Sequence, residues 1–192
     1  MKFFQCLTII FIILSIVAGS FLIPVSVAVY MHEWNMLSAF FIPMAVLWPL
    51  TLLLFIKTKR QPIRLTVREG ILLVSAAWLG AGLLGAVPFM LSGFVPHFSD
   101  AFFESVSGFT TTGASALQNI ESYPMALRVW RTQMHWLGGM GIVALTVALF
   151  PLLGVGGFQL IKSETSGPDK GKVTAKITHT AKALWFIYLG MT

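Results

Sequence analysis

Charged side chains are scarce in this chain. Only 10% of its 192 residues are charged, whereas 56% are hydrophobic and the mean hydropathy is +0.82. A typical soluble domain carries about 25% charged residues. The apolar residues form long blocks, not the short alternating strands of an outer-membrane barrel. The chain is therefore predicted to be an all-α integral membrane protein in contact with membrane lipid.

Cysteine is almost absent too. Cys6 is the only one, which excludes a disulfide framework and a cysteine-based zinc site. The net charge of +6 is spread over short loops and forms no basic stripe on a soluble domain, so we expect no binding of nucleic acid. No nucleophile–base pair or carboxylate pair in the sequence suggests an enzyme, and Ser105 and Ser107 have no histidine nearby in the sequence. We therefore expect neither an enzyme nor an organic cofactor.

Long apolar runs predict membrane-spanning helices, because about 20 such residues cross a bilayer. Four candidates are present: Phe4–Tyr30, Met36–Ile56, Val67–Leu91 and Met125–Leu153. Pro24 is expected to kink the first span or to mark its outer end. The N-terminus also resembles a secretory signal. However, the uncharged stretch between Lys2 and Glu33 is longer than the apolar core of a signal, about 7–15 residues, which favours a spanning helix.

The basic residues predict the orientation of these helices. Eleven of the 13 lie on one side, at Lys2, in the loop around 57–68 and in the linker around 162–182. Only Arg128 and Arg131 lie on the other side. Because cytoplasmic loops are enriched in Lys and Arg, we expect a multi-pass protein of the cytoplasmic (inner) membrane with its N-terminus in the cytoplasm.

Residues 98–117 follow a different pattern. Phe98 to Phe109 reads as a helix with Ser99 as N-cap. Its twelve residues reach about 18 Å, whereas the hydrocarbon core of a bilayer is about 30 Å thick. We therefore expect a half-length helix that enters the membrane from outside and does not cross it. Thr110 to Leu117 would return in extended form, which is tolerated only beside protein or a water-filled cavity.

Thr110, Thr111, Thr112 and Gly113 are the candidate cation-binding residues. A dehydrated monovalent cation is held by backbone carbonyls and threonine hydroxyls in potassium channels. Glycine permits the dihedral angles that point successive carbonyls the same way. The segment therefore predicts a selectivity filter, although in a soluble protein it would be an ordinary hydroxyl-rich turn.

These motifs resemble the TrkH/KtrB superfamily of potassium uptake proteins, and its TrkH branch in particular. The resemblance is carried by residues 103–114, by Trp130 and Arg131, and by residues 133–142, 151–157 and 180–185. The family fold has four helix–pore loop–helix repeats of the potassium-channel type around one pore, with two extra helices in front.

By this resemblance the chain has four parts. Residues 1–65 would hold the two extra helices and a basic loop, 66–154 the first repeat, 155–182 a cytoplasmic linker, and 183–192 the start of the outer helix of a second repeat. The apolar segment that continues to Thr192 leads us to expect a longer protein.

The resemblance also implies ligands and partners. Thr111, Thr112 and Gly113 would contribute carbonyls to potassium sites, with Thr110 beside them; potassium is the transported ion. Ser115 stands where potassium channels have a second filter glycine, which implies a looser outer site. The implied partners are the remaining pore repeats, a second copy in a homodimer, and a cytoplasmic nucleotide-binding regulatory ring of the TrkA/KtrA type.

Other polar residues in the apolar segments have simpler interpretations. Gly138, Gly139 and Gly141 indicate close helix packing, because no strand precedes them as in a dinucleotide site. Arg128 and Arg131 are expected to reach lipid headgroups or pair with Glu121. Glu104 is expected to hydrogen-bond behind the filter or to pair with an arginine, since a lone buried charge is costly.

Two functional alternatives remain open from the sequence. A chain with one repeat could be a non-transporting membrane fragment or packing module that lacks a complete pore. The same residues could also serve a carrier coupled to protons or sodium.

Overall fold

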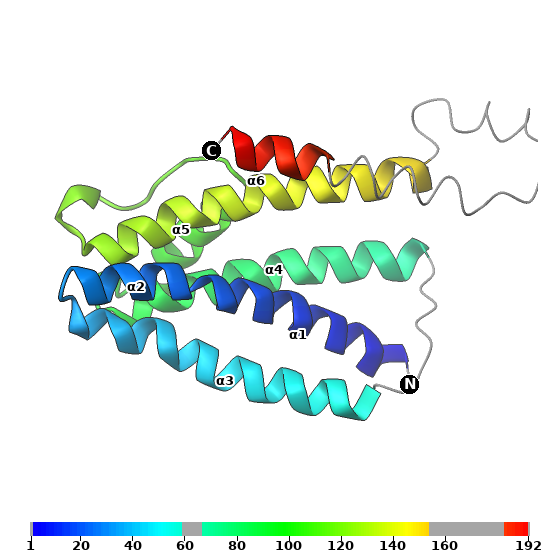
Figure 1. Cartoon of the computed structure of the whole chain (residues 1–192), viewed down its shortest axis with the longest axis horizontal. Helices are drawn as coiled ribbons and strands as arrows, with labels where there is room; N and C mark the ends of the chain where they lie inside the picture. The colour runs from blue at the N-terminus through cyan, green and yellow to red at the C-terminus, as the bar shows by residue number, and fades with distance from the viewer. Residues whose placement is uncertain (1, 59–66, 154–182, 192) are drawn as a thin grey trace, which may run out of the picture. The chain divides into compact units, whose positions relative to one another are not determined.

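Helices make up every regular element in residues 2–58, 67–153 and 183–191, the part of the chain that the computed structural model describes (Figure 1). The elements are α1 (Lys2–Ser20), α2 (Leu22–Tyr30), α3 (Trp34–Thr58), α4 (Val67–Leu91), α5 (Phe98–Phe109), the short 3-10 helix η1 (Ile120–Ser122) and α6 (Met125–Leu153). Residues 183–190 form one more helix. The chain divides into two compact units, Met1–Trp136 and Leu137–Thr192. The prediction of a helical chain is confirmed.

Three segments of the described chain are long and apolar enough to cross a membrane. They are Phe4–Tyr30, Trp34–Thr58 and Arg68–Leu91, with mean hydropathies of 2.8, 2.3 and 2.0. The bounds of α4, α5 and α6 match the predicted ranges, and α3 is two residues longer at each end. Residues 155–182, the predicted linker, lie outside the described residues.

The first span is broken where the sequence led us to expect a kink. Phe21 separates α1 from α2, and Pro24 lies in the first turn of α2. Because proline has no N–H, Pro24 cannot bond the carbonyl of Ser20 one turn earlier. The side-chain amide of Gln133 in α6 donates to that carbonyl instead, with Nε2 2.8 Å from the oxygen. A donor from a distant helix thus satisfies the carbonyl that the proline leaves free.

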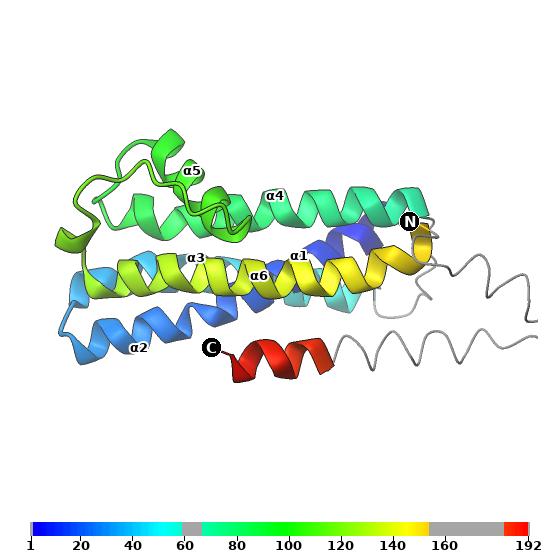
Figure 2. The same ribbon diagram turned by 90° about the horizontal axis from the view of Figure 1, so that it is seen from above.

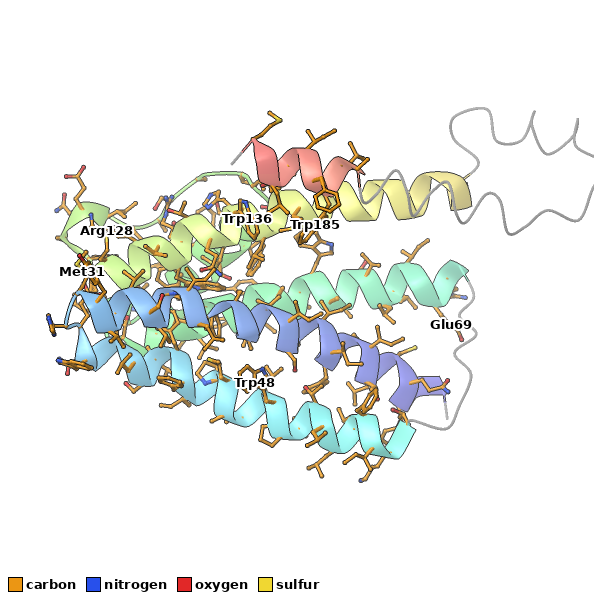
Figure 3. The ribbon with its side chains drawn as sticks, viewed as in Figure 1. Met31, Trp48, Glu69, Arg128, Trp136 and Trp185 are labelled. Atoms are coloured by element: carbon orange, nitrogen blue, oxygen red, sulfur yellow. The ribbon has the colours of Figure 1, made fainter. Side chains whose placement is uncertain are left out.

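Hydroxyl groups join α1 to α3, which lie side by side in Figures 1 and 2. Ser15 Oγ lies 2.6 Å from Thr51 Oγ1, and Trp48 Nε1 donates to the Ser15 carbonyl at 3.3 Å. Figure 3 places Trp48 between the two helices. Such interhelical hydrogen bonds help to hold membrane helices together, because the lipid is as apolar as the helix surfaces that pack against each other.

The loop between α2 and α3 is joined to the start of α6. Glu33 accepts hydrogen bonds from the backbone N–H groups of Met125 at 2.6 Å and of Ala126 at 3.0 Å. Its carboxylate therefore caps the α6 N-terminus, where free N–H groups and the helix dipole favour negative charge. Met31 and Arg128 lie at this same end of the first unit (Figure 3).

Helices α4, α5 and α6 approach closely at glycine residues. A Cβ atom at Gly85 of α4 would lie 2.7 Å from a Phe109 ring carbon and 3.0 Å from Met134 Sδ. A Cβ at Gly108 of α5 would lie 2.9 Å from the Met134 Cβ. These contacts fix α5 between its neighbours, as the small residues of α4 predict. Gly70 is an exception, since nothing lies within 4 Å of its position.

A glycine also permits a close helix contact in the second unit. A Cβ at Gly139 of α6 would lie 2.5 Å from Tyr188 Oη, which belongs to the helix of residues 183–190. The interpretation of the glycines around residue 139 as a packing surface is supported by this contact.

Candidate ion-binding segment

Helix α5 presents a buried face that contains polar residues. Ala101, Glu104, Ser105 and Gly108 follow the helical spacing and are all buried. The predicted N-cap at Ser99 is wrong, because the N-cap of α5 is His97 and Ser99 is the second residue of the helix. Ser99 Oγ donates to Asp100 Oδ1 at 3.1 Å. The chain enters α5 in extended form at His97 without a side-chain cap.

The C-terminus of α5 closes with two overlapping backbone hydrogen bonds. Thr112 N donates to Ser107 O at 2.9 Å, and Thr111 N donates to Gly108 O at 3.0 Å. This is a Schellman motif, in which the residue after the cap is left-handed and is most often glycine. Here that residue is Thr111, with φ +56°. A β-branched residue in this region is strained, and such strain concentrates at functional sites.

The Thr–Gly segment (Thr110 to Gly113) follows this helix end and leads into an extended stretch that ends near Leu117. Gly113 is left-handed with φ +77°, and nothing lies within 4 Å of where its Cβ would be. Ser107 Oγ donates to Ala114 O at 2.6 Å, which holds the chain just beyond the glycine. Ser107 thus holds the residue on each side of Gly113. Its carbonyl accepts from Thr112 N, and its hydroxyl donates to Ala114 O.

The four predicted cation-binding residues are exposed within the first unit. Thr110 Oγ1 lies 2.8 Å from Thr112 Oγ1. Within the described part of the chain, none of the hydrogen bonds found uses the backbone carbonyls of Thr110 to Gly113. These exposed oxygens are therefore open to water or to a ligand from outside the chain.

A buried carboxylate lies behind the segment. Glu104 of α5 is 0% exposed and pairs through Oε1 with Arg131 Nε of α6. Its Oε2 accepts a hydrogen bond from Ser115 Oγ at 2.8 Å. Ser115 Oγ in turn accepts from Leu117 N at 3.1 Å. We call these three side chains the Glu104 cluster (Glu104, Arg131 and Ser115). Arg131 thus pairs with Glu104 and not with Glu121, which was one of the two roles expected for it, and the expected arginine partner of Glu104 is confirmed.

The side chains of α6 support this arrangement. Trp130 is 0% exposed and donates from Nε1 to Gly85 O at 3.0 Å. Its ring contacts those of Phe21 and Phe109 edge to face, with centroids 4.6 and 6.2 Å away. His135 Nδ1 lies 2.9 Å from Arg131 O, which satisfies it one turn along the helix. Local sequence reasoning did not predict the roles of Ser107, Ser115 or Gln133, since their partners belong to other segments.

The spanning helices, the half-length helix and the extended segment after it define a polytopic helical membrane protein. The chain belongs to the TrkH family of cation transport proteins, whose family model matches residues 32–192. The resemblance drawn from the motifs is confirmed.

Individual relatives agree with this membership. The chain is 42% identical over 160 residues to the Trk system potassium uptake protein TrkH of Halomonas elongata, covering 82% of this chain and 33% of the relative. It is 40% identical over 185 residues to the protein of the same name from Escherichia coli K12, covering 91% and 36%. The chain therefore spans about a third of the length of these curated relatives.

A solved structure has the same fold. The crystal structure of the potassium transporter TrkH from Vibrio parahaemolyticus matches with a TM-score of 0.80 and 33% identity, over 98% of this chain and 37% of that one.

Proposed function

We propose that this chain supplies the first of four pore repeats in a protein that takes up potassium ions through a channel-like pore. The observation that carries the proposal is the set of unused carbonyls in the Thr–Gly segment, next to the C-terminus of a half-length helix. The relatives named above as potassium uptake proteins support potassium as the ion.

The chemistry of the segment suits a dehydrated cation. Thr110, Thr111, Thr112 and Gly113 are the proposed cation-binding residues, with the carbonyls of the last three as the main ligands. Carbonyl oxygens replace the hydration shell of K⁺ in channels of this kind. The C-terminal end of α5 adds partial negative charge beside the segment. Ser115 in place of a second glycine implies a looser outer site.

One repeat can surround only one side of an ion. The proposed pore therefore needs the remaining repeats, which would follow the helix that begins at residue 183. We also propose a homodimer, and a cytoplasmic nucleotide-binding ring of the TrkA/KtrA type as regulator. The proposed location is the inner membrane with the N-terminus in the cytoplasm, from the placement of Lys and Arg.

The substitution Gly113→Asp tests the filter. It should abolish potassium uptake, or its selectivity, in the complete transporter, in which this chain is joined to the remaining repeats. Gly113 needs a left-handed backbone, and a carboxylate there would also bind the ion too tightly or displace it. Potassium-limited growth of a transport-deficient strain and rubidium uptake measure the effect.

Gly93→Asp is the matched control. Gly93 also has φ +77° with nothing within 4 Å, but it lies in the loop before α5. Both variants carry the same charge and the same backbone strain, so only the first should lose uptake while both reach the membrane. Selective uptake at the unmodified rate by the Gly113 variant would refute the filter assignment.

A further inference from the structure

The Glu104 cluster forms a continuous link from α6 to the chain after the Thr–Gly segment. Arg131 of α6 pairs with Glu104 of α5, and Glu104 accepts from Ser115 of the extended stretch. Glu104 is 0% exposed, whereas the side chain of Arg131 is 23% exposed. A fully buried carboxylate needs such partners, and hydrogen bonds to a charged group are about twice as strong as neutral ones.

The hydroxyl of Ser115 has a fixed orientation. It holds one proton, which it donates to Glu104 Oε2, and its lone pair accepts from Leu117 N. The carbonyl of the preceding residue, Ala114, is held by Ser107 at 2.6 Å. The two residues directly after Gly113 are therefore both tied to α5, one through a neutral hydrogen bond and one through a charge-assisted bond.

We propose that the Glu104 cluster is a positioning unit for the cation site and sets its selectivity. The inference rests on the proposed function of the Thr–Gly segment. None of the three side chains is a proposed ligand of the ion. Glu104, paired with Arg131, accepts a hydrogen bond from Ser115 and so limits how far the carbonyls of Thr112 and Gly113 can move. A site whose oxygens are free to move adapts to a smaller cation such as Na⁺.

The substitution Ser115→Ala tests this role in the complete transporter. Ser115 is exposed in the first unit, so the substitution removes a hydrogen bond without leaving a cavity in a core. The selectivity for K⁺ over Na⁺, measured as inhibition of rubidium uptake by each ion, should fall about tenfold, as expected for the loss of one hydrogen bond to a charged group. Because selectivity is a ratio, the amount of protein in the membrane does not affect it.

Two further variants complete the experiment. Ser115→Thr keeps the hydroxyl and should retain the unmodified selectivity. Ser92→Ala is the matched control, because Ser92 Oγ also accepts from the N–H two residues on, of Phe94, but its own hydroxyl donates to the carbonyl of Phe89. It should leave selectivity unchanged.

The outcomes separate this inference from the one it rests on. Lower selectivity in Ser115→Ala, with rescue by Ser115→Thr, supports the positioning role. Unchanged selectivity in Ser115→Ala, in a transporter that takes up potassium, overturns the positioning role alone. Absence of potassium uptake by the unmodified complete transporter overturns both proposals.

Discussion

Gly85 is the residue at which α4 meets both α5 and α6. The position has room for a hydrogen atom only, since a Cβ there would contact Ser105, Phe109 and Met134. Its carbonyl also accepts the indole N–H of the buried Trp130. One residue without a side chain therefore allows α5 to sit close enough to α6 for Glu104 to reach Arg131.

The substitution Gly85→Ala should destabilise the protein by about 1–3 kcal/mol, because the added methyl group forces packed atoms apart. Thermal unfolding of the purified complete transporter in detergent measures this effect. Gly70→Ala in the same helix is the control, since nothing lies within 4 Å of Gly70. Equal stability of the two variants would contradict the close approach at Gly85.

Thr111 is the residue whose conformation the sequence predicts least well. Local preference places glycine, not a β-branched residue, at the left-handed position after a helix. The structure has Thr111 there, with φ +56°, and Gly113 two residues later with φ +77°. The sequence motif identified both residues as cation-binding candidates, but the strained backbone at Thr111 depends on how the helix end is closed by Ser107 and Gly108.

Individual helices were predictable to different degrees. The bounds of α4, α5 and α6 follow from runs of apolar residues and from the polar or proline-containing segments between them. The break between α1 and α2 follows from Pro24 only in part. The donor that makes this break tolerable is Gln133, 113 residues away from Ser20, and no local pattern encodes such a pairing.

A double-mutant cycle tests the exchange of hydrogen-bond donors at this break. Gln133→Leu removes the donor to the Ser20 carbonyl, and Pro24→Ala restores a backbone N–H that can bond the same oxygen. We expect the Gln133 substitution to cost about 1 kcal/mol less stability in the Pro24→Ala background than in the unmodified chain. Thermal unfolding of the four proteins gives the coupling. Additive effects would mean that Gln133 does not replace the missing bond.

Across the whole molecule, the N-terminal helices hold the helix that supports the candidate site. Glu33 caps α6, Gln133 of α6 bonds the chain between α1 and α2, and Phe21 packs on Trp130. The family resemblance implied two extra helices in front of a first repeat, and neither it nor the sequence pattern predicted the attachment of these helices to α6. Those contacts join residues about 100 positions apart, beyond the reach of periodicity or motif.

The chain by itself presents carbonyls from one side only, and it spans about a third of its curated relatives. The direct test of the account is therefore the position of the ion in the complete transporter. Crystals grown in rubidium, which stands in for potassium, should give an anomalous peak within coordination distance of the Thr111, Thr112 and Gly113 carbonyls. A well-ordered Thr–Gly segment with no peak beside it, and rubidium bound elsewhere on the pore axis, would contradict the account.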